Sequence, residues 1–151
     1  MNDERKFVLL VEDDPNDARL IQRCFDRTAL PVQVMRLQDG DEAVAYLDGV
    51  APYDNRVSHP LPCVVLLDLK LPRRSGLEVL QWIRSRTYEL RRLPVVMLTS
   101  SHHAVDINRA YDLGANSYLV KPETIEQLTE LVGLVKRYWL TINRDPRVTV
   151  S

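Results

Sequence analysis

Three short, uninterrupted runs of apolar residues constrain the fold of this chain more than any other feature of its sequence. They cover residues 7–11, 63–67 and 94–98, and within them apolar and polar residues do not alternate. Continuous runs of this length, rich in β-branched side chains, are typical of strands buried on both faces, as in a parallel sheet. Segments 32–37 and 117–120 are shorter or more mixed, which is typical of peripheral strands.

Helical periodicity fills the segments between these predicted strands. Asp14, followed by Pro15, is predicted to cap the first helix, Gly114 to end the fourth, and Thr124 and Gln127 to form a capping box before the fifth. Apolar residues recur at helical spacing in residues 18–25, 43–47, 77–83, 107–113 and 128–142. The order βαβαβαβαβα predicts an α/β fold, a doubly wound five-stranded parallel sheet with helices on both faces.

Reactive side chains stand where four of the predicted strands end. These strand ends are Glu12-Asp13-Asp14, Asp68, Thr99-Ser100 and Lys121-Pro122. Ligands of open parallel sheets bind outside the carboxyl ends of the strands, so we expect these groups to meet in one cleft. Several carboxylates in one cleft repel one another, and Mg²⁺, which prefers oxygen ligands, offsets that repulsion.

A phosphoryl group is the ligand that best uses this combination of side chains. Mg²⁺ and Lys121 would neutralise its oxygens, Thr99 would donate a hydrogen bond, and a carboxylate can be its covalent acceptor. The constellation resembles the receiver domain of two-component response regulators over residues 6–143. The resemblance implies the (βα)5, flavodoxin-like receiver fold. It also implies a signalling protein, not an enzyme, with self-catalysed phosphotransfer and dephosphorylation as its only reactions.

The resemblance also assigns the acceptor and the metal ligands. Asp68, in the segment 67–76, matches the phosphorylation site of the family. Asp13 and Asp68 would then bind Mg²⁺ directly, Glu12 would bind it through water, and Lys70 would offer its backbone carbonyl.

Two further positions match the phosphate-binding residues and the switch of the family. Lys121 and Thr99 would bind the phosphoryl oxygens, and Thr99 with Tyr118 would form the conformational switch. By resemblance, the Lys121–Pro122 peptide bond would be cis.

Within the family, the chain resembles the small single-domain regulators paired with bacterial, cyanobacterial-type phytochrome histidine kinases. The features that carry this are the long loop before residue 63, and the segments 98–102, 116–118 and 138–140. The resemblance implies that a sensor histidine kinase, of the phytochrome type, is the phosphoryl donor.

The predicted helix at 124–142 carries more apolar residues than one core-facing stripe needs. Leu134, Tyr138 and Leu140 are predicted to fall to its side or outward, and the sheet-covering residues are Leu128, Leu131, Val132, Val135, Trp139 and Ile142. An exposed apolar patch of this kind usually marks an interface. We therefore expect a homodimer through the helices at 107–113 and 124–142 and the strand at 117–120, with Leu134, Tyr138 and Trp139 in the interface. Alternatively, Tyr138 and Trp139 pack under the segment 143–151.

The composition limits which binding partners and which cellular compartment we expect for this protein. The 151 residues include 20 basic and 21 acidic side chains, a balance that argues against a dedicated nucleic-acid binder or an electrostatic membrane binder. The arginines of segment 84–92 are expected on a solvated face or a docking rim. Cys24 and Cys63 are predicted to be reduced core thiols, and with no targeting segment visible we expect a cytoplasmic protein. Residues 144–151 are expected to be a short tail without an output domain.

Three alternatives stay open from the sequence. A haloacid-dehalogenase-type phosphatase also forms an aspartyl phosphate, but it needs an aspartate where this chain has Lys70. A flavodoxin-like flavin protein would have a first loop rich in Ser, Thr and Gly, and the acidic segment 12–14 would repel its phosphate. A degenerate receiver would work without phosphorylation, although all of the expected site positions are filled.

Overall fold

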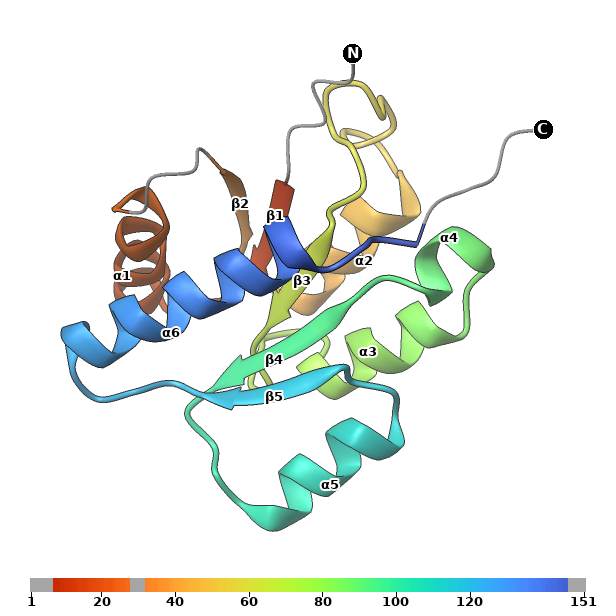
Figure 1. Cartoon of the computed structure of the whole chain (residues 1–151). Coiled ribbons are helices and arrows are strands. Elements are labelled where there is room, and N and C mark those ends of the chain that lie inside the picture. The colour runs from red at the N-terminus through yellow and green to blue at the C-terminus, as the bar shows by residue number, and fades with distance from the viewer. Residues whose placement is uncertain (1–6, 28–31, 147–151) are drawn as a thin grey trace.

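The computed structural model describes residues 7–27 and 32–146, which form one five-stranded parallel sheet covered by helices (Figure 1). The strands are β1 (Phe7–Val11), β2 (Gln33–Leu37), β3 (Val64–Leu67), β4 (Val95–Thr99) and β5 (Ser117–Val120). They lie in the order β2-β1-β3-β4-β5, and every neighbouring pair is parallel. The predicted doubly wound sheet is confirmed, and the strand order reverses direction between β1 and β3.

Helices lie on both faces of the sheet, as predicted. One face is covered by α1 (Pro15–Asp26) and α6 (Ile125–Arg137), and the other by α2 (Gly40–Asp48), α3 (Gly76–Arg84) and α5 (Ala104–Asp112) (Figure 1). Two short segments were not expected, α4 (Tyr88–Arg91) and the π-helix η1 (Tyr138–Ile142). Across the ranges that the structure describes, every helix is too short or too polar to cross a membrane.

The central strands bury both of their faces. In β1, Leu9 and Val11 belong to the core shared with α2 and α3, whereas Val8 and Leu10 belong to the core shared with α1 and α6. Side chains of a strand alternate between the two faces of a sheet. A strand with helices on both sides therefore needs apolar residues at every position, which explains the uninterrupted runs.

Arg84, at the end of α3, joins the loops that precede β4 and β5. Its guanidinium donates hydrogen bonds to the carbonyl oxygens of Gly114 (2.8 Å), Arg91 (2.9 Å) and Leu93 (2.7 Å) and to Oδ1 of Asn116 (2.8 Å). The prediction that the arginines of segment 84–92 lie on a solvated face or a docking rim is therefore wrong for Arg84, which bonds within the fold. Partly buried carbonyl oxygens lose contact with water, and this side chain supplies the donors that replace it.

The last helix departs from its predicted pattern where α6 passes into η1. Leu140, predicted to face sideways or outward, is buried, and Ile142, predicted to cover the sheet, is more than half exposed. A π-helix makes i→i+5 hydrogen bonds in a wider turn, so the residues after Arg137 rotate away from the 3.6-residue pattern. Leu134 and Tyr138 are exposed as predicted, with 63% and 49% of their surface accessible.

Candidate functional site

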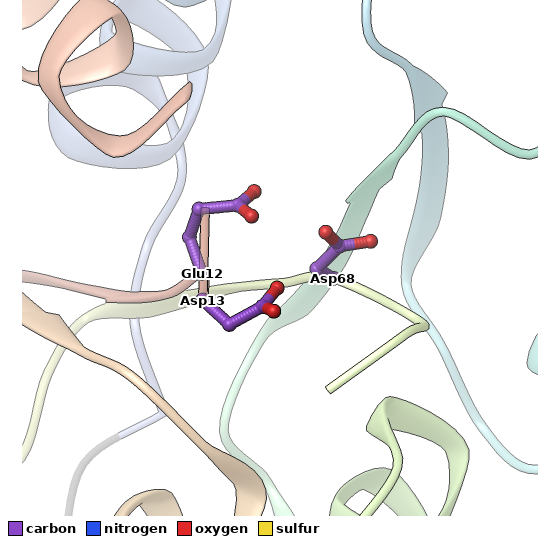
Figure 2. Close-up of side chains that lie close together, drawn as sticks. All are labelled: Glu12, Asp13 and Asp68. Carbon is purple, nitrogen blue, oxygen red and sulfur yellow. The ribbon is translucent and has the colours of Figure 1, made fainter. Parts of the chain in front are cut away.

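Three carboxylates meet where the strand order reverses, at the carboxyl ends of β1 and β3. Glu12 and Asp13 follow β1 directly, and Asp68 follows β3. One ligand oxygen from each of the three lies within 4.8 Å of the others. Figure 2 shows the Glu12 and Asp13 side chains leaving the same short segment and pointing toward the side on which Asp68 lies. The switch point of a doubly wound sheet is where such folds bind their ligands.

The short segment between β1 and α1 is held in place by contacts with β2 and with the first turn of α1. The guanidinium of Arg36, in β2, donates to the carbonyl oxygens of Glu12 (2.9 Å) and Asp13 (3.0 Å). The side chain of Asp14 accepts hydrogen bonds from the backbone of Asn16 and Asp17, so it caps α1 as predicted. Because the backbone is fixed at both ends, the two acidic side chains start from defined positions.

Asp68 is fixed by its own backbone surroundings. Its backbone N–H donates to the carbonyl of Val11 at 3.1 Å, and its Oδ1 accepts from the N–H of Leu69 at 2.7 Å. A Cβ placed on Gly76 would come within 2.0 Å of the carbonyl oxygen of Asp68. Only glycine lets α3 begin this close to the acidic cluster.

Lys121 is the cation of the site and contacts three carboxylates. Its Nζ lies 2.5 Å from Oε1 of Glu12, 3.0 Å from Oδ2 of Asp17 and 3.1 Å from Oδ2 of Asp68. Its backbone N–H donates to the carbonyl of Thr99 at 2.8 Å, which attaches the loop after β5 to the end of β4. The structure thus brings Glu12, Asp68 and Lys121 together, as the sequence predicts.

Burial and charge act on the two innermost groups of the site. Burial and the nearby charge of Asp68 raise the pKa of Glu12, the Lys121 ammonium opposes both, and the net result is a pKa of about 7. Burial lowers the pKa of Lys121, but its hydrogen bond to Glu12 and the charge of Asp68 outweigh burial, so the net shift is upward. Lys121 therefore keeps its positive charge at neutral pH.

The donor set fits a hard divalent cation. Glu12, Asp13 and Asp68 offer only carboxylate oxygens, and Lys121 alone cannot balance their charge. Oxygen ligands with room for water are the coordination that Mg²⁺ and similar cations prefer. Lys70 lies two residues after Asp68 with an exposed side chain, and the role of its backbone carbonyl stays a prediction.

The two predicted switch residues lie on neighbouring strands. Thr99 is buried at the end of β4, and Tyr118 is half-buried in β5. Met97 pairs with Tyr118 and Thr99 pairs with Val120, so the two predicted residues point to the same face of the sheet. The Tyr118 hydroxyl donates to the carbonyl oxygen of Ser101 at 2.9 Å, in the loop that follows Thr99. The switching role itself stays a prediction.

Sequence reasoning missed two residues of the site and misjudged one bond. Asp17 and Arg36 were not singled out, because Asp17 lies in the first turn of α1 and Arg36 lies within β2, not at the carboxyl end of a strand. The Lys121–Pro122 bond, expected to be cis, is trans, the isomer that X–Pro bonds favour by about 0.5–1 kcal/mol.

Comparison with known proteins identifies relatives over nearly the whole chain. The model of the response regulator receiver domain family matches residues 8–133. The chain is 43% identical to the probable methanogenesis regulatory protein FilR2 of Methanothrix harundinacea over 139 residues, which are 92% of this chain and 86% of that protein. It is 38% identical to the response regulator Rcp1 of Synechocystis sp. over 143 residues, 93% of this chain and 95% of that protein.

Solved structures agree with these relatives. The crystal structure of the phosphorylated cyanobacterial phytochrome response regulator RcpA superimposes with a TM-score of 0.88 at 38% identity, covering 95% of this chain and 99% of RcpA. The Mn²⁺-bound form of Rcp1 gives a TM-score of 0.85 at 36% identity, covering 94% of this chain and 99% of that structure. Sequence, fold and site therefore agree that this chain belongs to the response regulator receiver domain family.

Proposed function

We propose that this protein is a phosphoacceptor switch in which Asp68 receives a phosphoryl group from the phosphohistidine of a sensor histidine kinase. The observation that carries the proposal is the setting of Asp68. Its side chain is 10% exposed, its Oδ2 lies 3.1 Å from the Lys121 ammonium, and two further carboxylates stand beside it. The relative RcpA has been solved in a phosphorylated form, which supports phosphorylation as the function of this chain.

The transfer is a displacement at phosphorus. A carboxylate oxygen of Asp68 forms the new P–O bond, while the P–N bond to the kinase histidine breaks and leaves its electron pair on the imidazole nitrogen. Oδ1 is already held by the Leu69 N–H at 2.7 Å, so Oδ2, on the Lys121 side, is the attacking oxygen. Lys121 and the hydroxyl of Thr99 would then donate to the phosphoryl oxygens.

Mg²⁺ is the cation we propose for the acidic cluster. Asp13, Asp68 and the Lys70 carbonyl would bind it directly and Glu12 through water, and the bound ion would supply charge neutralisation at the phosphoryl oxygens. The oxygen-only donor set and the Mn²⁺-bound structure of Rcp1 support a hard divalent cation.

Thr99 and Tyr118 are the proposed route from Asp68 to the protein surface. A phosphoryl oxygen that accepts from Thr99 would draw that buried side chain toward Asp68. The Tyr118 hydroxyl, which donates to Ser101 in the adjoining loop, would respond to that movement. The surface affected would be the one formed by α5, β5 and α6.

The proposed partners are a phytochrome-type histidine kinase and a second copy of the chain. The likeness to RcpA over 99% of that structure supports the first, and the exposure of Leu134 and Tyr138 beside the half-buried Trp139 supports the second. We place the protein in the cytoplasm, where such a kinase presents its phosphohistidine, and propose no binding to nucleic acid or membrane.

Intact-mass measurement tests this function. After incubation with acetyl phosphate and MgCl₂, the protein should gain the mass of one phosphoryl group, and EDTA should prevent the gain. Asp68→Asn should gain nothing, whereas Asp14→Asn, which changes an aspartate in the same cluster of loops, should behave like the wild type. Phosphorylation of Asp68→Asn to the wild-type level would refute the proposal.

A further inference from the structure

Lys121 has no free donor in this structure. A lysine ammonium carries three N–H donors, and here the three acceptors are Glu12, Asp17 and Asp68. The proposed function requires Lys121 to donate to a phosphoryl oxygen on Asp68. Because the proposed transfer uses Oδ2 of Asp68, the N–H that contacts this oxygen is freed by the reaction itself, whereas Glu12 and Asp17 continue to compete with the phosphoryl oxygens for the ammonium.

The two contacts that remain, with Glu12 and Asp17, differ in how readily they can be given up. The Glu12 side chain is 1% exposed and its oxygen is the nearest to Nζ, at 2.5 Å. The Asp17 side chain is 37% exposed, and its contact is 3.0 Å long. A carboxylate that reaches solvent regains water when it loses its partner, whereas a buried carboxylate pays the full desolvation cost. Asp17 is thus the partner that can release Lys121.

Asp17 has no place in the proposed transfer reaction. It stands in the first turn of α1, and it is not one of the three clustered carboxylates that could share a metal ion. The side chain of Asp14 caps α1, so the side chain of Asp17 is not needed for the cap.

From these contacts we propose that Asp17 is a positioning residue for Lys121. In the unphosphorylated protein it accepts a hydrogen bond from one N–H of the lysine, and its carboxylate competes with the phosphoryl group for the Lys121 ammonium. The inference rests on the proposed function of Asp68, and it adds a residue that sets how strongly the site holds a phosphoryl group.

Binding of beryllium fluoride, a phosphoryl mimic that adds to a carboxylate, measures this competition at equilibrium. Isothermal titration calorimetry in MgCl₂ would compare the wild type with Asp17→Asn, Asp17→Glu, Asp14→Asn and Asp68→Asn. Asp17→Asn should bind about two- to fivefold more tightly, because a partly exposed ion pair no longer competes. Asp17→Glu keeps the carboxylate and should stay within about twofold of the wild type.

Asp14→Asn is the control for charge alone. It removes the same charge three residues earlier, asparagine caps a helix as well as aspartate does, and Asp14 does not contact Lys121. Its affinity should equal that of the wild type. A change in helix stability alone would not alter the affinity of the folded protein, so a difference between the two asparagine variants reports on Lys121.

The outcomes separate this inference from the proposed function. Loss of binding in Asp68→Asn together with tighter binding in Asp17→Asn alone supports both. Equal affinity of Asp17→Asn and wild type, or equal tightening in Asp14→Asn, overturns the role of Asp17 and leaves Asp68 as the acceptor. Absence of binding in the wild type, or equal binding in Asp68→Asn, refutes the proposed function and this inference with it.

Discussion

At the scale of the residue, an excess of negative charge governs the site. Glu12, Asp17 and Asp68 contact one ammonium, that of Lys121, and the Asp13 carboxylate lies beside Glu12 and Asp68. Burial raises the pKa of Glu12 to about 7, so this carboxyl exchanges a proton near neutrality in the absence of a cation. A divalent cation or a protonated carboxyl relieves the same repulsion, and this is why we expect the site to bind metal.

Removal of single charges should affect Mg²⁺ binding in opposite ways. Asp13→Ala should weaken Mg²⁺ binding by at least about tenfold, because it deletes a carboxylate ligand. Lys121→Ala should bind Mg²⁺ at least as tightly as the wild type, because it removes a competing cation. Calorimetric titration with MgCl₂ would check both, with Asp14→Asn as control, and equal affinities of wild type and Asp13→Ala would contradict the assignment.

The site residues at the carboxyl ends of strands could be predicted from the sequence. The site residues that lie elsewhere in a helix or a strand could not. Asp13, Asp68 and Lys121 meet because the carboxyl ends of parallel strands lie at one edge of the sheet. The position of Asp17 depends on the angle at which α1 leaves its loop, and the contacts of Arg36 depend on the reach of its side chain from β2 to the segment after β1. Neither property follows from spacing along the chain.

At the scale of the element, the loop between α2 and β3 is built around Tyr46 and Arg56. The Tyr46 ring is fully buried, and its hydroxyl donates to the carbonyl oxygen of Pro60 at 2.8 Å. The guanidinium of Arg56 donates to the carbonyl oxygens of Tyr46 (2.9 Å) and Leu47 (2.6 Å), near the end of α2. These contacts give the long loop a defined path beside the core.

Tyr46 should make the protein sensitive to alkali. Burial raises its pKa to about 12 from an ordinary value of 10.0, so the unfolded chain loses this proton first as the pH rises. The free energy of unfolding should therefore be intact below pH 10 and fall between pH 10 and 12, by up to about 2–3 kcal/mol.

Urea denaturation at several pH values would measure this effect. Tyr46→Phe should lose about 1 kcal/mol at pH 7, from the missing hydrogen bond to Pro60, and should show a shallower decline above pH 10. Tyr88→Phe, at a residue exposed on α4, is the matched control and should decline as the wild type does. Parallel curves for wild type and Tyr46→Phe would show that Tyr46 is not the group responsible.

Element boundaries were predictable where helices keep a regular period and pack on the sheet. The regular pattern fails in η1, where a π-turn moves Leu140 into the core. It also fails in α5, where Ala110 is the buried residue and Tyr111 is half exposed, because this helix flanks the peripheral strand β5. The order of the strands in the sheet could not be predicted from the sequence, because strand pairing depends on contacts between segments that are distant along the chain.

At the scale of the whole molecule, the surface along α6 and η1 is the candidate for self-association. A groove of about 840 Å³ runs between α6, β5 and the segment that follows η1. It is lined by apolar side chains that include Leu119, Leu131, Leu134, Tyr138 and Trp139. Pro146 also lines the groove, so the segment after η1 lies near Tyr138 and Trp139. This agrees with the alternative prediction, in which these two side chains pack against the C-terminal segment and do not form an interface.

Sedimentation equilibrium would decide between these roles of the surface. If it is an interface, the wild type should be a dimer at micromolar concentration, and Tyr138→Glu should be a folded monomer because it places a charge on the apolar patch. Val57→Glu, at a residue 92% exposed in the loop before β3, should stay dimeric. A wild-type protein that is monomeric throughout this range, phosphorylated or not, would exclude the dimer.

The central claim is that Asp68 is the sole acceptor of the phosphoryl group. The most direct test is to phosphorylate the protein with acetyl phosphate and MgCl₂, reduce it with borohydride, and map the peptides by mass spectrometry. Borohydride converts an aspartyl phosphate to homoserine, so we expect homoserine at position 68 and unmodified aspartate at positions 13, 14 and 17. Homoserine at another position, or a borohydride-resistant phosphate with Asp68 unmodified, would contradict the account.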